Sequence, residues 1–215
     1  MTFGRSDVLE LLAAYNEATW PAPAVLSLVA FITVCLAFFP VPGRNRMASL
    51  LLAFMWFWSA AVYHFWFFAR LTPAAYVFAL LFAAQGALIL RAGVFRSDLK
   101  FWMHDGSRHL AGILLIFYAL VAYPSISALL GHAFPAAPTF GVPCPLTIFT
   151  LGILLIARAP YPRALFAIPL VWAVVGTFLG MELKIREDFA LIVAAALVMT
   201  MTPTDDDPDV VDARS

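Results

Sequence analysis

Long blocks of apolar residues, uninterrupted by charge, constrain this chain more than any other feature. The blocks show neither the alternation of a half-buried strand nor the single apolar stripe of a helix on a soluble protein, so we expect them to face lipid. Hydrophobic residues make up 63% of the chain and charged residues 12%. Soluble domains carry roughly 25% charged residues, which is enough polar surface to face water. The sequence therefore predicts an all-α integral membrane bundle.

Charges, prolines and glycines divide the apolar blocks into seven predicted transmembrane helices. Proline and glycine interrupt helices, and arginine marks the ends of several blocks. The predicted segments are 21–39, 49–69, 73–90, 110–130, 146–157, 164–181 and 189–202. We expect three regions: an interfacial amphipathic helix within 1–19, a seven-helix bundle over 20–203, and a disordered acidic tail over 204–215, which holds five aspartates.

The basic residues predict the orientation of the bundle. Loops one, three and five hold eight lysines and arginines, whereas the N-terminus and loops two, four and six hold four. Because cytoplasmic loops carry the excess of positive charge, the N-terminus is expected outside and the C-terminus in the cytoplasm. The start of the chain lacks the small-residue cleavage site of a signal peptide, so the first apolar helix is expected to stay in the protein.

The apolar segments also lack residues that several membrane functions need. No Asp, Glu, Lys or Arg lies in the middle of any of the seven segments. Proton relays, voltage sensors and charged filter rings depend on such side chains at membrane depth. A retinal-binding protein needs a lysine in its last helix, and segment 189–202 has none. A net charge of zero gives no reason to expect a nucleic-acid partner.

The fifth segment is too short to cross a bilayer as a regular helix. Its twelve residues would span roughly 18 Å, against about 30 Å of hydrocarbon. The stretch before it, 135–145, contains four prolines and cannot be helical. We therefore expect a broken approach to the fifth helix, tolerated because protein or water surrounds it. Cys144 would lie at the helix start, where the dipole favours a thiolate or an anion. The alternative is an ordinary proline-rich outer loop.

Several functional side chains are predicted to meet at the outer end of the bundle. Glu187 and Asp188 of loop six are predicted to lie among these side chains, although charged residues in loops are more often solvated. Imidazole and thiolate together suit a soft or borderline metal ion. The predicted ligands of such an ion are His64, His132 and Cys144. The spacing of these residues is not that of a known metal motif, and buried packing is the competing interpretation. The predicted ligand-binding residues are His64, His132, Thr139, Cys144, Thr147 and Glu182.

Short motifs along the chain resemble a family of uncharacterised bacterial multi-pass membrane proteins, classed as a domain of unknown function. The stretch Pro138-Thr-Phe-Gly-Val-Pro-Cys-Pro145 is the most specific of them, and members usually have a threonine where this chain has Leu146. The resemblance covers nearly the whole chain. It implies a bacterial inner membrane protein and brings no activity with it. The other motifs are Tyr63-His64, Pro73-Ala-Ala-Tyr76, Gln85-Gly86, Gly131-His132 and Thr147-Ile-Phe-Thr150.

Three hypotheses for function follow from these features. The leading one is a membrane protein that binds or transports a small solute or metal ion in the outer pocket. The second is an accessory or scaffold subunit of a larger membrane complex, or a homo-oligomer. The third is a membrane enzyme with Cys144 as nucleophile, for which only His64 or His132 is expected to serve as base.

Overall fold

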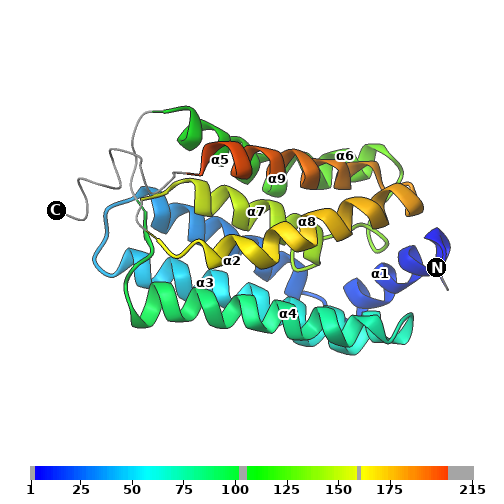
Figure 1. Cartoon of the computed structure of the whole chain (residues 1–215). Helices are drawn as coiled ribbons and strands as arrows, with labels where there is room; N and C mark the ends of the chain where they lie inside the picture. Colours follow the sequence, from blue (N-terminus) through cyan, green and yellow to red (C-terminus); the bar gives the residue numbers. More distant parts are fainter. Residues whose placement is uncertain (1–2, 102–105, 159–160, 203–215) are drawn as a thin grey trace.

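The computed structural model describes residues 3–101, 106–158 and 161–202, and it is almost entirely helical. The predicted acidic tail lies outside the described residues. The long helices run side by side along the bundle, with α1 at one end and the end of α9 at the other (Figure 1). In chain order the elements are α1 (Arg5–Thr19), α2 (Ala22–Phe38), α3 (Arg44–Trp58), η1 (Ser59–Phe67), η2 (Phe68–Arg70), α4 (Ala74–Ile89), η3 (Leu90–Phe95), β1 (Lys100–Phe101), α5 (Ser107–Phe117), η4 (Tyr118–Ala122), α6 (Tyr123–Leu129), α7 (Pro143–Leu155), β2 (Ala157–Arg158), α8 (Ala164–Leu183), η5 (Arg186–Phe189) and α9 (Ala190–Met201).

The all-α prediction is confirmed, and each predicted apolar segment contains a helix. In the part of the chain that the structure describes, four continuous helical stretches are long and apolar enough to cross a membrane: Arg44–Arg70, Ala74–Phe95, Ser107–Leu129 and Ala164–Leu183. A fifth span arises if α1 and α2, which meet at 83°, count as one bent helix. Helices α7 and α9 have 13 and 12 residues and are shorter than a span. Seven complete crossings therefore stay a prediction.

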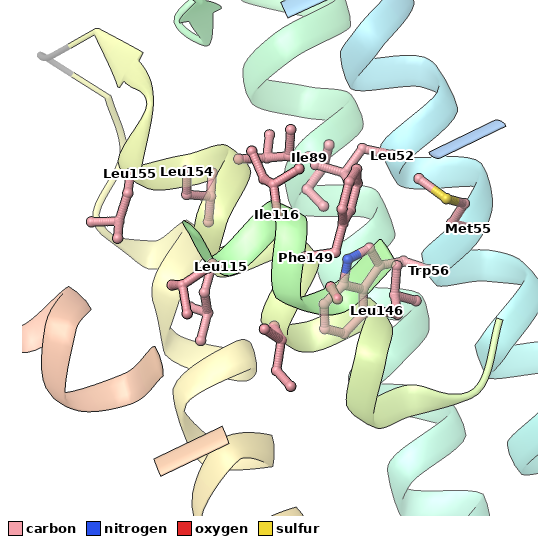
Figure 2. Packing of buried hydrophobic residues seen from close by; sticks show 14 of the residues in the cluster. Leu52, Met55, Trp56, Ile89, Leu115, Ile116, Leu146, Phe149, Leu154 and Leu155 are labelled. Carbon is pink, nitrogen blue, oxygen red and sulfur yellow. The ribbon is translucent and has the colours of Figure 1, made fainter. Parts of the chain in front are cut away.

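Helix α7 is the centre of the bundle rather than a lipid-facing helix. Every residue from Pro143 to Leu155 except Cys144 is buried. Its side chains, Phe149 and Leu154 among them, pack with residues of α3, α4 and α5 (Figure 2). Because protein encloses α7 on all sides, its length does not have to match the thickness of a bilayer. This is the physical reason that a 13-residue apolar helix is stable here.

Two glycines allow α5 and α7 to cross at backbone contact. A Cβ atom on Gly152 would lie 2.8 Å from the carbonyl oxygen of Gly112 and 3.0 Å from the backbone nitrogen of Ile116. A Cβ atom on Gly112 would lie 2.8 Å from the carbonyl oxygen of Gly152. Small residues at such positions let membrane helices approach closely.

Helix α1 packs against the bundle instead of lying apart from it. Val8, Leu11, Leu12 and Tyr15, on the predicted apolar face, are buried, whereas Glu10 is exposed. These residues join a hydrophobic cluster with the π-helical turn η1 and the end of α8. Helix α1 therefore covers the end of the bundle at which the functional side chains were predicted to gather.

Candidate functional site

The polar side chains at the α1 end come from four parts of the chain. Tyrosines lie within the π-helical turns η1 and η4 or directly after them. Such π-turns are frequent at functional sites. The irregular stretch 131–142 follows α6, and α7 starts directly after it. The short turn η5 connects α8 to α9. These elements bring His132, Cys144, Glu187 and Asp188 to the same end of the bundle, as the sequence predicts.

Asp188 is the centre of this group. Its carboxylate accepts a hydrogen bond from the Tyr123 hydroxyl at 2.6 Å, and the Cys144 thiol donates a second one. Only 5% of Asp188 is exposed. Burial raises the pKa of Asp188 from 3.8 to about 7, the two hydrogen bonds lower it, and the neighbouring Glu187 raises it further. Asp188 can therefore change its charge near neutral pH.

Asp188 and Cys144 line a cavity of about 60 Å³ inside the bundle. A site needs roughly 10–15 Å³ of such volume for each water, so the cavity has room for a few waters or one small solute. Helix α1 contributes Val8 and Leu12 to its wall. No Lys, Arg or His of the described chain lines it. The lining residues are Phe3, Val8, Leu12, Tyr63, Phe68, Tyr123, Pro138, Val142, Pro143, Cys144, Trp172, Leu179, Leu183, Ile185 and Asp188.

Two further polar groups in the cavity wall lack a strong partner. Tyr63 is only 7% exposed, and within residues 3–101, 106–158 and 161–202 its hydroxyl makes no hydrogen bond. The Trp172 indole N–H has only the weakly accepting sulfur of Cys144 beside it. Buried polar groups are nearly always paired, so the unpaired Trp172 N–H in the same wall as the Tyr63 hydroxyl favours a bound molecule or water that completes the hydrogen bonding there.

A second polar chain lies beside the cavity and connects α1 to η5. Nδ1 of His132 lies 2.9 Å from the Glu187 carboxylate, and Nε2 lies 2.8 Å from the Arg5 guanidinium. Arginine can only donate, so Nε2 must accept and Nδ1 must carry the proton that His132 donates to Glu187. Glu187 is 1% exposed. The chain therefore runs from an arginine cation through a neutral imidazole to a buried carboxylate.

Asn16 of α1 binds the proline-rich stretch directly. Its side-chain amide donates to the carbonyl oxygens of Pro135 at 2.5 Å and Ala137 at 2.7 Å, and its Oδ1 accepts from the Thr139 hydroxyl at 2.7 Å. These three hydrogen bonds all join the Asn16 side chain to the same loop. Helix α1 and the stretch 131–142 therefore form one hydrogen-bonded cover over this end of the bundle.

The structure does not bring the predicted site residues together as one pocket. His64 is enclosed by aromatic rings, including those of Phe82 and Trp172, and neither ring nitrogen has a hydrogen-bond partner among the described residues. Thr147 is buried, and its hydroxyl is likewise unpartnered there. Glu182 is exposed. Of the six predicted ligand-binding residues, Cys144 alone lines the cavity.

The three predicted metal ligands are also separated by their partners. His132 binds Glu187 and Arg5, and Cys144 binds Asp188. In the part of the chain that the structure describes, no three His, Cys, Asp or Glu side chains are grouped so that they could hold a metal ion. The predicted thiolate at the start of α7 is not favoured either, because a carboxylate beside a thiol disfavours its ionisation.

Other residues of the predicted motifs have structural roles. Gln85 donates from its side chain to the carbonyl oxygen of Leu165 at 2.8 Å, and Thr150 accepts from the Trp56 indole at 2.9 Å. Gly131 adopts a positive φ of 88° directly after α6. Since these positions satisfy buried polar groups or turn the chain, they support the fold around the cavity.

Sequence reasoning predicted Glu187 and Asp188 at this end but did not predict their burial. Solvated loop charges were the competing interpretation for them, and both are buried. Trp172, within the sixth apolar segment, gave no signal. The sequence signal that could have indicated burial of the two acids is their position between the hydrophobic residues Ile185 and Phe189.

A wider groove opens to the side of the bundle next to the cavity. It has a volume of about 230 Å³ and lies between α2, η4 and the stretch 134–140. Trp20 and Phe134 lie at its mouth, where their rings meet edge to face. Tyr123 and Pro138 line both the groove and the cavity, so these two residues form the wall between them.

Comparison with known proteins agrees with the resemblance seen in the sequence motifs at the level of the family. No curated protein and no solved structure shows significant similarity to this chain. A family of unknown function matches residues 6–206, which include α1, the proline-rich stretch, α7 and η5. The chain belongs to this family of unknown function, DUF6064.

Proposed function

We propose that this protein is a multi-pass membrane protein that binds a small solute in the cavity beneath α1. One observation carries the proposal: a buried carboxyl group, Asp188, and Tyr63, whose hydroxyl has no hydrogen-bond partner among the described residues, line the same small and mainly apolar cavity. A buried, unpaired polar group costs free energy, so proteins keep such an arrangement mainly where a ligand or water satisfies it.

The membrane part of the proposal rests on the outer surface of the bundle. Large hydrophobic side chains are exposed on each of the long helices, Phe31 on α2, Leu80 on α4 and Phe178 on α8 among them. Soluble monomers rarely expose contiguous apolar surface on this scale, whereas a bilayer requires it. The proposed arrangement has seven crossings, in which α7 and α9 are the short fifth and seventh. The charge bias of the loops supports an orientation in a bacterial inner membrane with the α1 end outside.

This arrangement makes α1 the cover of the solute site. Val8 and Leu12 line the cavity on the α1 side, while Asn16 and Arg5 bind the helix to the 131–142 stretch. A solute from the outer side would reach Asp188 when this cover opens locally. Contacts at the edge of a bundle are among those that open most readily, and lids over binding sites are drawn from them.

The proposal can be tested by thermal unfolding of the purified protein with small solutes of each charge type. Any ligand that binds only the folded state raises the melting temperature in a concentration-dependent way. We expect at least one solute to stabilise the wild type and to lose this effect in Asp188→Asn. Glu182→Gln, an exposed acid at the same end, should respond like the wild type. If no solute of any charge type stabilises the wild type, the proposal is wrong.

The two other hypotheses gain less from the structure. A cysteine enzyme was expected to use His64 or His132 as base, but the Cys144 thiol is paired with Asp188. An accessory subunit would present apolar surface to a partner, but lipid contact accounts for the exposed residues equally well. A homo-oligomer or larger complex is compatible with the solute site and is not an alternative to it.

A further inference from the structure

The size of the cavity limits the ligand to a few non-hydrogen atoms. Sites for drug-sized ligands measure roughly 300–1,000 Å³, and this cavity measures about 60 Å³. Nucleotides, sugars and lipid headgroups are therefore too large to be held entirely within it. An ion or a molecule of two to four heavy atoms fits, provided that its polar atoms match the wall.

The charge of the wall favours a cation. Among the described residues, Asp188 supplies the one carboxyl group that lines the cavity, and no positively charged residue lines it. The adjacent acid, Glu187, already accepts from His132. A negative ligand would meet an unopposed carboxylate at close range, whereas a positive ligand would neutralise it.

The rest of the wall matches an organic cation better than a metal ion. Aromatic side chains of Tyr63, Phe68, Tyr123 and Trp172 line the cavity, and ring faces attract ammonium groups. Metal ions need a fuller ligand set: zinc takes three or four donors, and calcium takes six to eight oxygens. Asp188 and Cys144 offer one carboxylate and one thiol. In contrast, an ammonium group needs only acceptors for its N–H bonds, which Asp188 and the free Tyr63 hydroxyl provide.

From this geometry we infer that the cavity binds a small ammonium-type cation, with its N–H groups directed at Asp188 and Tyr63 and its remaining surface against the aromatic rings. The inference rests on the proposed function, because it names the class of solute for that same cavity. Two contacts fix the ligand. The Asp188 carboxylate supplies charge, and the Tyr63 hydroxyl supplies the second acceptor from the opposite element, η1.

The test is equilibrium binding of radiolabelled methylammonium to the purified full chain, with formamide and formate as neutral and negative competitors of similar size. We expect saturable binding that formamide and formate do not displace at equal concentration. Asp188→Asn should weaken binding by roughly 30-fold or more, because it removes one member of a buried charge pair. Tyr63→Phe should weaken it by roughly 5–10-fold, because one hydrogen bond is lost. Glu182→Gln should bind as the wild type does.

The outcomes separate this inference from the proposed function. If formamide or formate stabilises the wild type and methylammonium neither binds nor stabilises it, the inference is overturned while the solute site stands. If methylammonium binds equally well to the wild type and to Asp188→Asn, the cation is held elsewhere and the inference is also overturned. If no solute binds or stabilises the protein, the proposed function fails together with the inference. Circular dichroism of each variant shows whether it is folded, and Tyr63→Phe provides a second, milder variant if Asp188→Asn does not fold.

Discussion

Replacing Asp188 with asparagine should change how the stability of the protein depends on pH. The pKa of Asp188 is about 7 in the folded protein, against an ordinary value of 3.8. The folded state therefore holds this proton more tightly than the unfolded state, and the wild type loses stability as pH rises from about 4 to about 7. A shift of about three pKa units corresponds to roughly 4 kcal/mol, since each unit is about 1.4 kcal/mol. Asparagine cannot ionise, so Asp188→Asn should lack this loss.

The difference in unfolding free energy between Asp188→Asn and the wild type, followed as a function of pH, reports on the ionisation of Asp188. The titratable groups that face Asp188 are Tyr63, Tyr118, Tyr123, Cys144 and Glu187, and both proteins contain all of them. Asparagine has one acceptor oxygen for the Tyr123 and Cys144 donors, which costs about 1 kcal/mol at every pH. The variant should thus be slightly less stable than the wild type at pH 4 and more stable by about 3 kcal/mol at pH 8.

Thermal unfolding in detergent, followed by tryptophan fluorescence from pH 4 to pH 8, measures this difference. For a chain of this size, 1 kcal/mol corresponds to roughly 2–4 °C, so the melting-temperature difference between variant and wild type should swing by roughly 10 °C over this range. Glu182→Gln should give a profile parallel to the wild type, because this acid is exposed. Parallel profiles for Asp188→Asn and the wild type would refute the reasoning, since they would show that Asp188 is not a buried, protonatable carboxyl.

Two further predictions concern the packing that holds the site. Gly152→Ala should destabilise the protein by about 2–3 kcal/mol, because its Cβ atom would meet the backbone of Gly112, which cannot move aside. Gly86→Ala should cost less, since its Cβ atom meets only the ring of Phe57, and equal melting temperatures for the two variants would contradict this argument. His132→Ala should cost about 3 kcal/mol by leaving the buried Glu187 carboxylate without its donor, and adding Glu187→Gln should restore part of the loss. Chemical unfolding of the single and double variants measures this coupling, and purely additive losses would show that the two residues do not interact.

The sequence predicts the helices well because their signals are local. Apolar blocks bounded by proline, glycine and arginine place α4 at Ala74–Ile89 against a predicted 73–90, and α8 at Ala164–Leu183 against 164–181. The prolines of 135–145 predict the irregular stretch before α7, but the prediction that all of 135–145 is non-helical is wrong at its end, because α7 begins at Pro143 and accommodates Pro143 and Pro145 in its first turn. Glycines within the apolar segments also indicate close helix crossings, because small residues let helix backbones approach each other.

The site is less predictable because its contacts are distant in the sequence. Asp188 is buried by Tyr123, 65 positions away, and His132 reaches Arg5 across 127 positions. A charged stretch between two apolar helices has the composition of a solvated loop, and only tertiary packing decides that α1 covers it. His64 shows the opposite error. A histidine in an apolar segment is a reasonable ligand candidate, but aromatic side chains enclose its ring and leave it outside the cavity wall.

The reactivity of Cys144 gives the most direct test of whether the cavity binds a solute. The chain has two cysteines, so Cys35→Ser leaves Cys144 as the single thiol, and Cys35 on α2 does not line the cavity. A small neutral thiol reagent is added to this variant with and without methylammonium, formamide or formate, and the modified fraction is followed by mass spectrometry. We predict that the thiol reacts through the cavity and that methylammonium, at concentrations that stabilise the fold, slows this reaction several-fold. A modification rate that none of the three solutes changes would contradict the account.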